Sequence, residues 1–355
     1  MKIIKEKNDW NQLLNIEFSK KYNDVFFNYD YFDLYTKNYN SNLEGVFWED
    51  ENVKIFWPHL VRDISEINQF KKFKYYDLTT PYGYGGPLII AKTKEKTKTA
   101  DSLKEFFKEY RNYALENNYI CEFVRFHPIF KNWEFLDKFF NIDYLNDVVI
   151  IDLKQDLEKI RQQIKKGHKY NIKKSEKEGC KVRVIKKPNE KNIQDFIKIY
   201  YQTMDKNQAS KKYYFPEKFI GDHFKFLNAI LIETEYKNKI IGSSIFICGD
   251  KIIHYFLSGA SEEFKGLYPS NLTLWEAIKW AKEHNFKILH LGGGRGKNDS
   301  LFEFKKGFSD LIKPFKVGKI IFNANAYSQL NKINGGDMSD DYFPPYRRGF
   351  NEEII

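Results

Sequence analysis

The segment "LGGGRGKNDSLFEFKKGFSD", residues 291–310, holds the residue types best suited to phosphate chemistry. Its glycines would let a backbone approach a phosphate, and Lys297 would add a positive charge. The spacing fails both common nucleotide motifs. Leu291 stands where a GxxxxGK[ST] loop needs its first glycine, and a GxGxxG fingerprint lacks its third glycine after Gly292 and Gly294. The glycines therefore predict a turn beside a site.

A second loop, "FLSGASEEFKGLYPSNLTLWEAI" (residues 256–278), predicts a strand, a glycine- and serine-bearing loop and a helix. The helix is expected to begin near Pro269 or Ser270, with Ser270 or Asn271 as its N-cap. A helix N-terminus presents unpaired N–H groups and the positive end of a dipole, which suits a pyrophosphate. The alternative is an ordinary capped helix without a ligand.

Residues 103–128 and 272–294 predict the same unit twice, a helix that ends in an asparagine followed by a strand. Asn118 matches Asn285, and glycine- and proline-bearing loops, "TTPYGYGGPLII" and "SGASEEFKGLYPSN", precede both helices. We therefore predict two copies of one α/β domain, at residues 1–146 and 147–330. A tail at 331–355 is expected to pack back on the first domain.

Within the second domain, residues 147–153 predict a strand and residues 155–179 one helix that Gly179 stops. A further strand and helix follow. Residues 229–260 then predict three strands joined by hairpins at "YKNK" and "CGDK". A helix and a strand lead into the glycine segment.

The net charge of +10 favours a polyanionic partner, which could be a phosphate-bearing cofactor, a nucleotide-linked substrate or RNA. A solvated lysine-rich face is the alternative. Three distant cysteines, Cys121, Cys180 and Cys248, favour a reducing compartment over a disulfide framework or a zinc site. With no apolar leader and no apolar run of membrane length, the sequence predicts a cytoplasmic protein without a membrane partner. No metal and no particular oligomeric state are predicted.

The order of the elements resembles the GCN5-related N-acetyltransferase (GNAT) fold, and more closely its tandem, FemAB-like branch. The resemblance rests on "YGYGGPL" (82–88), "RFHP" (125–128), "IKKGHKYNIKKSEKEGCKV" (164–182), "IYYQTMDK" (199–206), "YFLSGAS" (255–261), "YPSNLTLWEAIKWA" (268–281) and "LGGG…DSLFEFKKGFS". It implies an α/β fold of tandem GNAT-like domains, each with a mixed central sheet flanked by helices. It also implies acyl transfer to an amine by the second domain, with the acceptor on the first.

In that fold, main-chain N–H groups at the end of a splayed fourth strand hold the donor carbonyl. By resemblance these map to Phe256, Leu257, Ser258 and Gly259, with Leu257 or Ser258 facing the oxyanion. The donor pyrophosphate maps to Lys265, Gly266, Leu267, Tyr268, Pro269, Ser270 and Asn271, with Phe304 and Lys305 nearby. The sequence departs from the usual [RQ]xxGx[GA] signature, because Glu263 comes first and Tyr268 and Pro269 follow Gly266.

The resemblance leaves three alternatives. The preferred one is an N-acyltransferase with acyl-coenzyme A (acyl-CoA) as donor and a nucleotide-linked amino sugar of a surface polysaccharide as acceptor. The second uses aminoacyl-tRNA and a UDP-linked peptidoglycan precursor, which the basic stretch 161–177 and Lys305 favour. The third is a non-catalytic module that binds RNA or another anion.

His254 is the first candidate for the base, because an unperturbed histidine titrates near neutrality. Asp299 and Glu303 are the reserves, acting through water. The acceptor is expected to contact aromatic, glycine and basic residues that suit a sugar and a diphosphate. These are Tyr82, Tyr84, Gly85, Arg125, His127, Tyr201, Tyr213, Tyr214, Tyr255 and Arg295.

Overall fold

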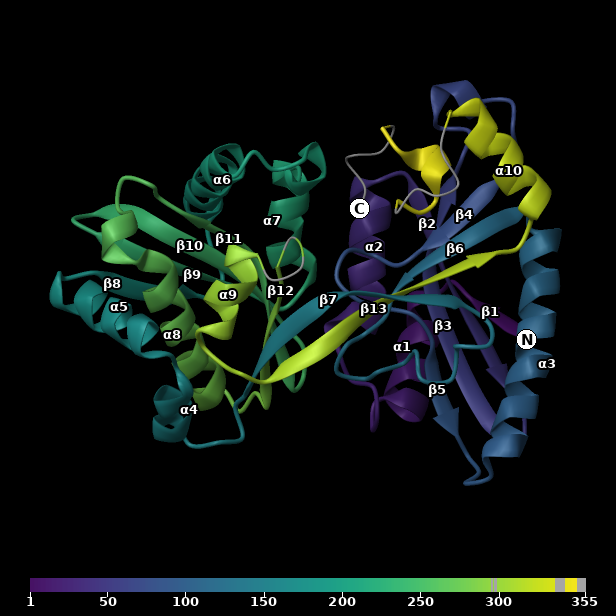
Figure 1. The fold of residues 1–355 in the computed structure, drawn as a ribbon, viewed down its shortest axis with the longest axis horizontal. Helices are drawn as coiled ribbons and strands as arrows, with labels where there is room; N and C mark the ends of the chain where they lie inside the picture. The colour runs from purple at the N-terminus through teal and green to yellow at the C-terminus, as the bar shows by residue number, and fades with distance from the viewer. Residues whose placement is uncertain (295, 297–298, 336–341, 350–355) are drawn as a thin grey trace. The chain divides into compact units, whose positions relative to one another are not determined.

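The computed structural model describes residues 1–294, 296, 299–335 and 342–349 (Figure 1). The chain divides into two compact units. Unit 1 comprises Met1–Leu145 and Phe315–Ile355, and unit 2 comprises Asn146–Pro314. Each unit is a mixed sheet flanked by helices, which confirms the predicted fold class. Unit 2 ends at Pro314, before the boundary at residue 330 expected from the sequence, because the following strand pairs within unit 1.

The sheet of unit 1 has the order β1-β2-β3-β4-β6-β13, with β5 beside β3. Its pairs are antiparallel except for β4 and β6, which run parallel. The strands are β1 (Lys2–Ile4), β2 (Ser41–Glu49), β3 (Val53–Asp63), β4 (Tyr76–Thr79), β5 (Leu88–Ala91), β6 (Tyr119–Arg125) and β13 (Ile312–Ile321).

Neighbouring residues of β3 face opposite sides of this sheet, as strand geometry requires. Trp57 stacks on Phe106 and Tyr110 of α3, while Phe56 meets the edge of Trp10 on α1. The helices of unit 1 are α1 (Lys7–Leu13), α2 (Tyr29–Asn38), α3 (Lys96–Glu116) and α10 (Ala324–Ile333). These helices thus bury apolar side chains on both faces of the sheet.

The sheet of unit 2 has the order β7-β12-β11-β10-β9-β8, with only β11 and β12 parallel among these pairs. The three hairpin-linked strands expected from the sequence are present. Lys237 and Asn238, between the first two of them, both have positive φ angles, +48° and +62°, as the predicted tight turn requires. The strands are β7 (Asn141–Asp152), β8 (Lys181–Ile185), β9 (Ala229–Tyr236), β10 (Lys239–Cys248), β11 (Ile252–Ala260) and β12 (Ile288–Gly293).

The helix predicted over residues 155–179 is two helices, because Ile164 and Lys165 take extended backbone angles between them. Gly179 does follow the second helix with a φ of +89°, as its predicted role requires. Helices α5 and α8 cover one face of the sheet and α6 packs on the other. The helices are α4 (Leu157–Gln163), α5 (Lys166–Lys177), α6 (Glu190–Lys206), α7 (Glu217–Phe226), α8 (Pro269–Glu283) and α9 (Ser300–Lys306).

The two units repeat one topology. In each, a helix leads into a strand that lies parallel to its neighbour, β6 beside β4 and β12 beside β11. Asn118 after α3 and Asn285 after α8 have nearly the same left-handed φ angles, 59° and 63°. None of the helices in the described part of the chain is long and apolar enough to cross a bilayer.

Candidate functional site

The parallel strands β11 and β12 pair over a short stretch only. Their ladder runs from Ile252 opposite Ile288 to His254 opposite His290. Strand β11 continues to Ala260, and along residues 255–260 no ladder partner on that side occurs among the described residues. Beyond His254, the main chain of β11 therefore has no ladder pairing with described residues of β12, although the Ala260 N–H donates to Thr203 Oγ1 over 3.0 Å.

Strand β11 also carries a β-bulge in this stretch. Leu257 lies opposite Ile245 of β10, but the next ladder pair is Tyr255 opposite Phe246, so Phe256 is the extra residue. A bulge increases the local twist and redirects main-chain groups, and bulges are over-represented next to active sites. The bulge falls in the residues expected to hold a donor carbonyl.

Two serines lie beside the bulge. Ser244 of β10 donates a hydrogen bond to the Oγ of Ser258 over 3.0 Å, and both side chains hydrogen-bond Tyr255. Burial raises the pKa of Tyr255, and these hydrogen bonds oppose that effect. The hydroxyl of Tyr255 is therefore neutral at physiological pH.

Helix α9 places a buried ammonium at the end of β12. The Nζ atom of Lys305 donates to the main-chain oxygen of Gly293 over 2.6 Å and lies 5.7 Å from the centre of the Tyr255 ring. Burial lowers the pKa of Lys305 to about 8, against the opposing charge of Asp299. Lys305 is thus close to the bulged strand and near its titration range at neutral pH.

Both ends of α9 are fixed by side chains. Asp299 is the N-cap, and its Oδ1 accepts from the Phe302 N–H over 2.8 Å. At the other end, His168 of α5 donates from Nε2 to the oxygen of Phe304 over 2.8 Å. A side chain on Gly307 would collide with this imidazole, since an added Cβ would lie 2.2 Å from its Nε2.

The expected catalytic groups have different surroundings. His254 is buried at the last position where β11 pairs with β12, with its ring centre 5.3 Å from that of His290. Asp299 caps α9, while Glu303 forms an exposed ion pair with Lys165 over 3.6 Å. Proton transfer through Asp299 or Glu303 would therefore compete with these contacts.

Sequence reasoning missed His223, on α7. Its Nδ1–H donates to the Phe219 oxygen over 2.8 Å, and its ring lies 4.8 Å from that of Phe256 in the bulge. The Nε2 atom is buried and has no partner in the described part of the chain. Burial lowers the pKa of His223 to about 4, so this imidazole is neutral at pH 7. The sequence signal that could have identified His223 is its place among the apolar residues of "FIGDHF".

The predicted caps of α8 are wrong. The helix begins at Pro269, and its N-cap is Tyr268, whose backbone is left-handed with a φ of 51°. Proline suits the first helical position because its φ is already fixed and its missing N–H is not needed there. The side chain of Asn271 is instead buried, and its Oδ1 accepts from Asn171 of α5 over 3.5 Å. Ser270 is half-buried.

The loop before α8 has balanced charges. Glu262 pairs with Lys265 over 2.6 Å and also with Lys206 of α6, and Glu263 lies 4.0 Å from Lys239. Gly266 is exposed, and a Cβ added there would meet nothing within 4 Å. The loop thus offers room beside its backbone, while its charged side chains are engaged in ion pairs within the loop and with α6 and β10. Leu267, half-buried, completes the short turn Lys265–Leu267.

The expected acceptor residues of unit 1 lie close together. The rings of Tyr84 and His127 meet edge to face at 5.5 Å, and the main-chain oxygen of Tyr82 accepts from the Tyr31 hydroxyl. The N–H of Gly85 donates to the oxygen of Arg125 over 2.7 Å.

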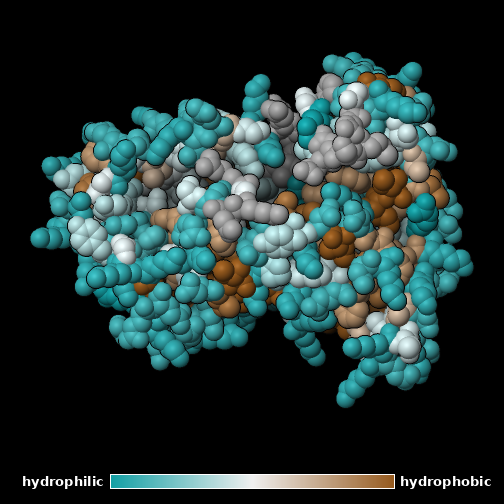
Figure 2. All heavy atoms as spheres, in the orientation of Figure 1, coloured by the Kyte–Doolittle hydropathy of each residue, from teal (hydrophilic) through white to brown (hydrophobic). Residues whose placement is uncertain are grey.

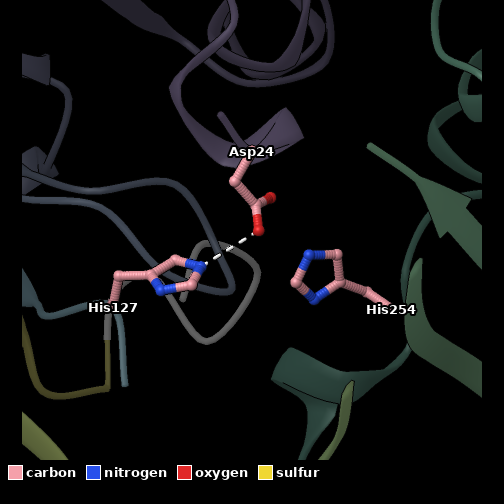
Figure 3. A group of neighbouring side chains, drawn as sticks. All are labelled: Asp24, His127 and His254. Carbon is pink, nitrogen blue, oxygen red and sulfur yellow. Dashed lines mark hydrogen bonds and ion pairs between the residues drawn. The ribbon is translucent and has the colours of Figure 1, made fainter. Parts of the chain in front are cut away.

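His127 has both ring nitrogens engaged inside unit 1. Its Nε2 donates to Asp24 Oδ2 over 3.1 Å, the dashed line in Figure 3. Its Nδ1 accepts from the N–H groups of Ile129 and Phe130. These contacts hold the "FHP" turn in place, so the side chain serves the shape of the loop. His254, also drawn, is the β11 residue of unit 2.

The expected acceptor residues of unit 2 are mostly tyrosines. The Tyr201 hydroxyl donates to the Phe215 oxygen over 2.7 Å, and its ring lies 5.8 Å from that of Tyr214, whose hydroxyl donates to Asp205. The Tyr213 oxygen accepts from Tyr200. Tyr255 lies instead at the bulge, and Arg295 falls outside the described residues.

Helix α5 presents a basic face. Lys166, Lys173 and Lys177 are exposed and have no ion-pair partner among the described residues. Tyr170, on the same helix, is 62% exposed. The face of unit 2 drawn in Figure 2 is mainly hydrophilic. Lysines and an aromatic ring together suit a nucleic acid.

The comparisons with known proteins agree with this geometry. The profile of the FemAB family matches residues 222–331. This range contains the bulged strand, the loop before α8 and Lys305. A search of curated protein sequences gave no match.

Among solved structures, FemX resembles the protein with a TM-score of 0.68 at 10% identity, covering 93% of this chain and 99% of the other. A tandem GNAT protein from the clavulanic acid biosynthesis pathway has a TM-score of 0.55 at 5% identity, covering 91% and 98%. These likenesses extend over both units. The protein therefore has the tandem GNAT-type fold of FemAB-like proteins, and this supports an acyl- or aminoacyltransferase.

Proposed function

We propose that unit 2 transfers an acyl group from an activated donor to a primary amine. The observation that carries this proposal is the separation of β11 from β12 after the His254–His290 pair, with the bulge at Phe256 in the separated stretch. Strand separation of this kind leaves main-chain N–H groups to a ligand, and backbone donors fixed in advance stabilise a developing oxyanion.

The chemistry needs few side chains. The lone pair of a neutral amine attacks the carbonyl carbon of a thioester, and the oxyanion accepts from the N–H of Leu257 or Ser258. The carbon–sulfur bond then breaks, the amide forms, and the proton lost by the amine is matched by one gained by the thiolate. Holding the reactants together supplies much of the rate, because it replaces a bimolecular encounter.

We assign to Lys305 the role of protonating the leaving thiolate. Its ammonium is buried near Tyr255 at the end of β12, and a pKa of about 8 lets it carry a proton at neutral pH and release it readily. His254 and His223 are the candidates for taking the proton of the amine. Both are buried histidines whose rings lie along the bulged strand.

The preferred donor is acyl-CoA, with its pyrophosphate at the loop 265–271. The positive end of α8 and the open space at Gly266 suit a phosphate that approaches the backbone. Because Lys265 already pairs with Glu262, main-chain N–H groups would carry most of this recognition.

The preferred acceptor is the amino group of a nucleotide-linked amino sugar used for a surface polysaccharide, with unit 1 as the acceptor domain. This assignment rests on the resemblance to tandem acyltransferases. The tyrosines of unit 1 support it, because aromatic rings pack on sugars and bases.

The basic face of α5 favours a second candidate, an aminoacyl-tRNA donor with a UDP-linked peptidoglycan precursor as acceptor. Lys166, Lys173 and Lys177, which have no ion-pair partner in the described part of the chain, and the exposed ring of Tyr170 would suit the backbone and bases of an RNA. A protein that binds RNA and transfers nothing would correspond to the non-catalytic alternative.

A paired donor assay tests the proposal. The protein is incubated with an amino-sugar nucleotide panel and either acyl-CoA or aminoacyl-tRNA, and thiol release or amide formation is measured. The triple variant K166Q/K173Q/K177Q should weaken only the tRNA reaction, whereas K104Q/K108Q on α3 of unit 1 should change neither. Absence of amide product with both donor classes would refute an acyltransferase.

A further inference from the structure

We propose that Arg125 of unit 1 binds an anionic group, a phosphate or a carboxylate, on the molecule that unit 1 receives. This inference takes only the acceptor role of unit 1 from the proposed function. It requires that molecule to carry a negative charge, and it names the residue that recognises this charge.

The backbone of Arg125 is held on both sides. Its N–H donates to Thr80 Oγ1 over 3.3 Å, and its oxygen accepts from the Gly85 N–H over 2.7 Å. The guanidinium lies over the ring of Phe123, with Cζ 4.8 Å from the ring centre. The side chain is therefore packed against Phe123 without an ion pair to any described residue, and a side chain positioned in advance suits a receptor.

The charges around Arg125 are out of balance. Buried Asp77 accepts from Arg62 Nε over 2.7 Å and also pairs with Arg347, so one carboxylate serves two guanidinium groups. The Nη1 atom of Arg125 is itself buried and has no partner in the described part of the chain. Buried charges in proteins are normally paired, so an unpaired one requires an explanation.

The direction of the pKa shift of Arg125 follows from this geometry. Burial lowers it to about 10, and the charge of Arg62 lowers it further, while the hydroxyls of Tyr342, Tyr35 and Tyr82 act in the opposite direction. The groups that raise it most strongly among the described residues are these three tyrosines, and no carboxylate is among them. An incoming anion would therefore supply the missing negative charge.

The geometry of guanidinium selects the ligand. Its planar fork matches the two oxygens of a phosphate or carboxylate, and tyrosine hydroxyls can donate to the same oxygens. A nucleotide-linked sugar would bring phosphate, and a sugar acid or a peptide would bring carboxylate. Both sources share the chemistry that Arg125 recognises.

The test compares Arg125→Met, Arg125→Lys and the wild type in thermal unfolding and calorimetric titration at constant ionic strength. The probes are inorganic pyrophosphate and UDP for phosphate, and glucuronate and citrate for carboxylate. We expect the wild type to be stabilised by one of the two pairs, which identifies the source. Arg125→Met should bind that probe at least about tenfold more weakly, with Arg125→Lys between the two.

The stability of the ligand-free variants separates a receptor from a structural residue. Arg125→Met should unfold at the temperature of the wild type or above it, because the variant removes a half-buried guanidinium whose buried Nη1 has no hydrogen-bond partner among the described residues. Arg111→Met, an exposed arginine of the same unit, is the control for loss of positive charge and should bind the probe like the wild type.

Two results would overturn the inference. One is a wild type that none of the four probes stabilises, and the other is a ligand-free Arg125→Met protein that unfolds well below the wild type. Because no acyl donor is present, failure of the acyl-transfer assay alone would leave these binding results unaffected.

Discussion

The ammonium of Lys305 and the main-chain oxygen of Gly293 lie 2.6 Å apart, so α9 is tied to the end of β12 by a charged side chain that is 8% exposed. A single carbonyl dipole compensates a buried ammonium only in part, which is why burial lowers its pKa to about 8. This position carries a cost in stability, and the proposed mechanism gives it a use in proton transfer.

Replacing Lys305 with Met should therefore stabilise the fold and abolish transfer. The folded pKa of about 8 lies below the ordinary value of 10.5, so the unfolded chain binds more protons between these values. Relative to K305M, the wild type should lose up to about 3 kcal/mol as pH falls from 10.5 to below 8. Urea unfolding at several pH values measures this difference.

Lys306→Met is the matched control, because Lys306 is the half-buried neighbour on the same helix. It should keep both the activity and the pH profile of the wild type. If K305M were destabilised at pH 7, the ammonium would be a stabilising group and the proposed role in proton transfer would lose its physical basis.

His223 should reduce stability in acid. Its folded pKa of about 4 lies below the ordinary 6.5, so the stability present above pH 6.5 falls as pH drops toward 4, by up to about 3 kcal/mol. The variant His223→Gln should lack this part of the acid sensitivity. Chemical denaturation between pH 7.5 and 4 gives the comparison.

His284→Gln provides the control for His223, because His284 makes the same kind of bond, from Nδ1 to the oxygen of Trp280, but is exposed. Its acid profile should match that of the wild type. Parallel profiles for His223→Gln and the wild type would show that the imidazole is not buried as described.

Gly259 should tolerate no side chain. A Cβ there would lie 2.6 Å from the main-chain oxygen of Ile199, so alanine must push α6 away from β11. We expect G259A to cost about 1–3 kcal/mol and to reduce transfer, because it disturbs the bulged strand. G266A, where an added Cβ meets nothing, should leave stability unchanged. Equal unfolding midpoints for the two variants would contradict the packing of α6 on β11.

Arg347 should behave in the opposite way to Arg125. Its Nε lies 2.5 Å from Asp77 Oδ2, and both residues are buried, so R347M leaves the carboxylate with one guanidinium fewer. Loss of one partner of a buried ion pair costs about 3–5 kcal/mol. R348M, at an exposed neighbour, should cost nothing measurable. Thermal unfolding of both variants, once each is shown to be folded, measures this difference. An unchanged melting temperature of R347M would disprove the anchoring of the C-terminal segment.

Local signals in the sequence predicted much of unit 2. Three of these signals are residues with a left-handed backbone: the turn at Lys237 and Asn238, the helix stop at Gly179, and the repeat marked by Asn118 and Asn285. Residue types that favour this backbone can be recognised from the local sequence alone. The resemblance to tandem acyltransferases placed Lys305 and the bulged strand in one region.

Other features depend on contacts that the sequence does not display. The break at Ile164 and Lys165 interrupts a stretch with good helix formers, and Tyr268 takes a left-handed conformation that bulky residues rarely adopt. His223 contacts Phe256 from a separate helix. Arg125 differs from Arg62 and Arg347, because those two arginines both pair with the carboxylate of Asp77. These relationships arise only once the strands are paired.

Unit 1 is interrupted in the chain by the whole of unit 2. Strand β13 pairs with β6 through Val317–Ile321, and Arg347 reaches Asp77 from near the end of the sequence. A ribosome therefore finishes every strand of unit 2 before it supplies the last strand of unit 1. During synthesis, the edge of β6 that will pair with β13 stays unpaired and open to wrong partners. Unit 1, which contains the N-terminus, therefore completes its sheet after unit 2.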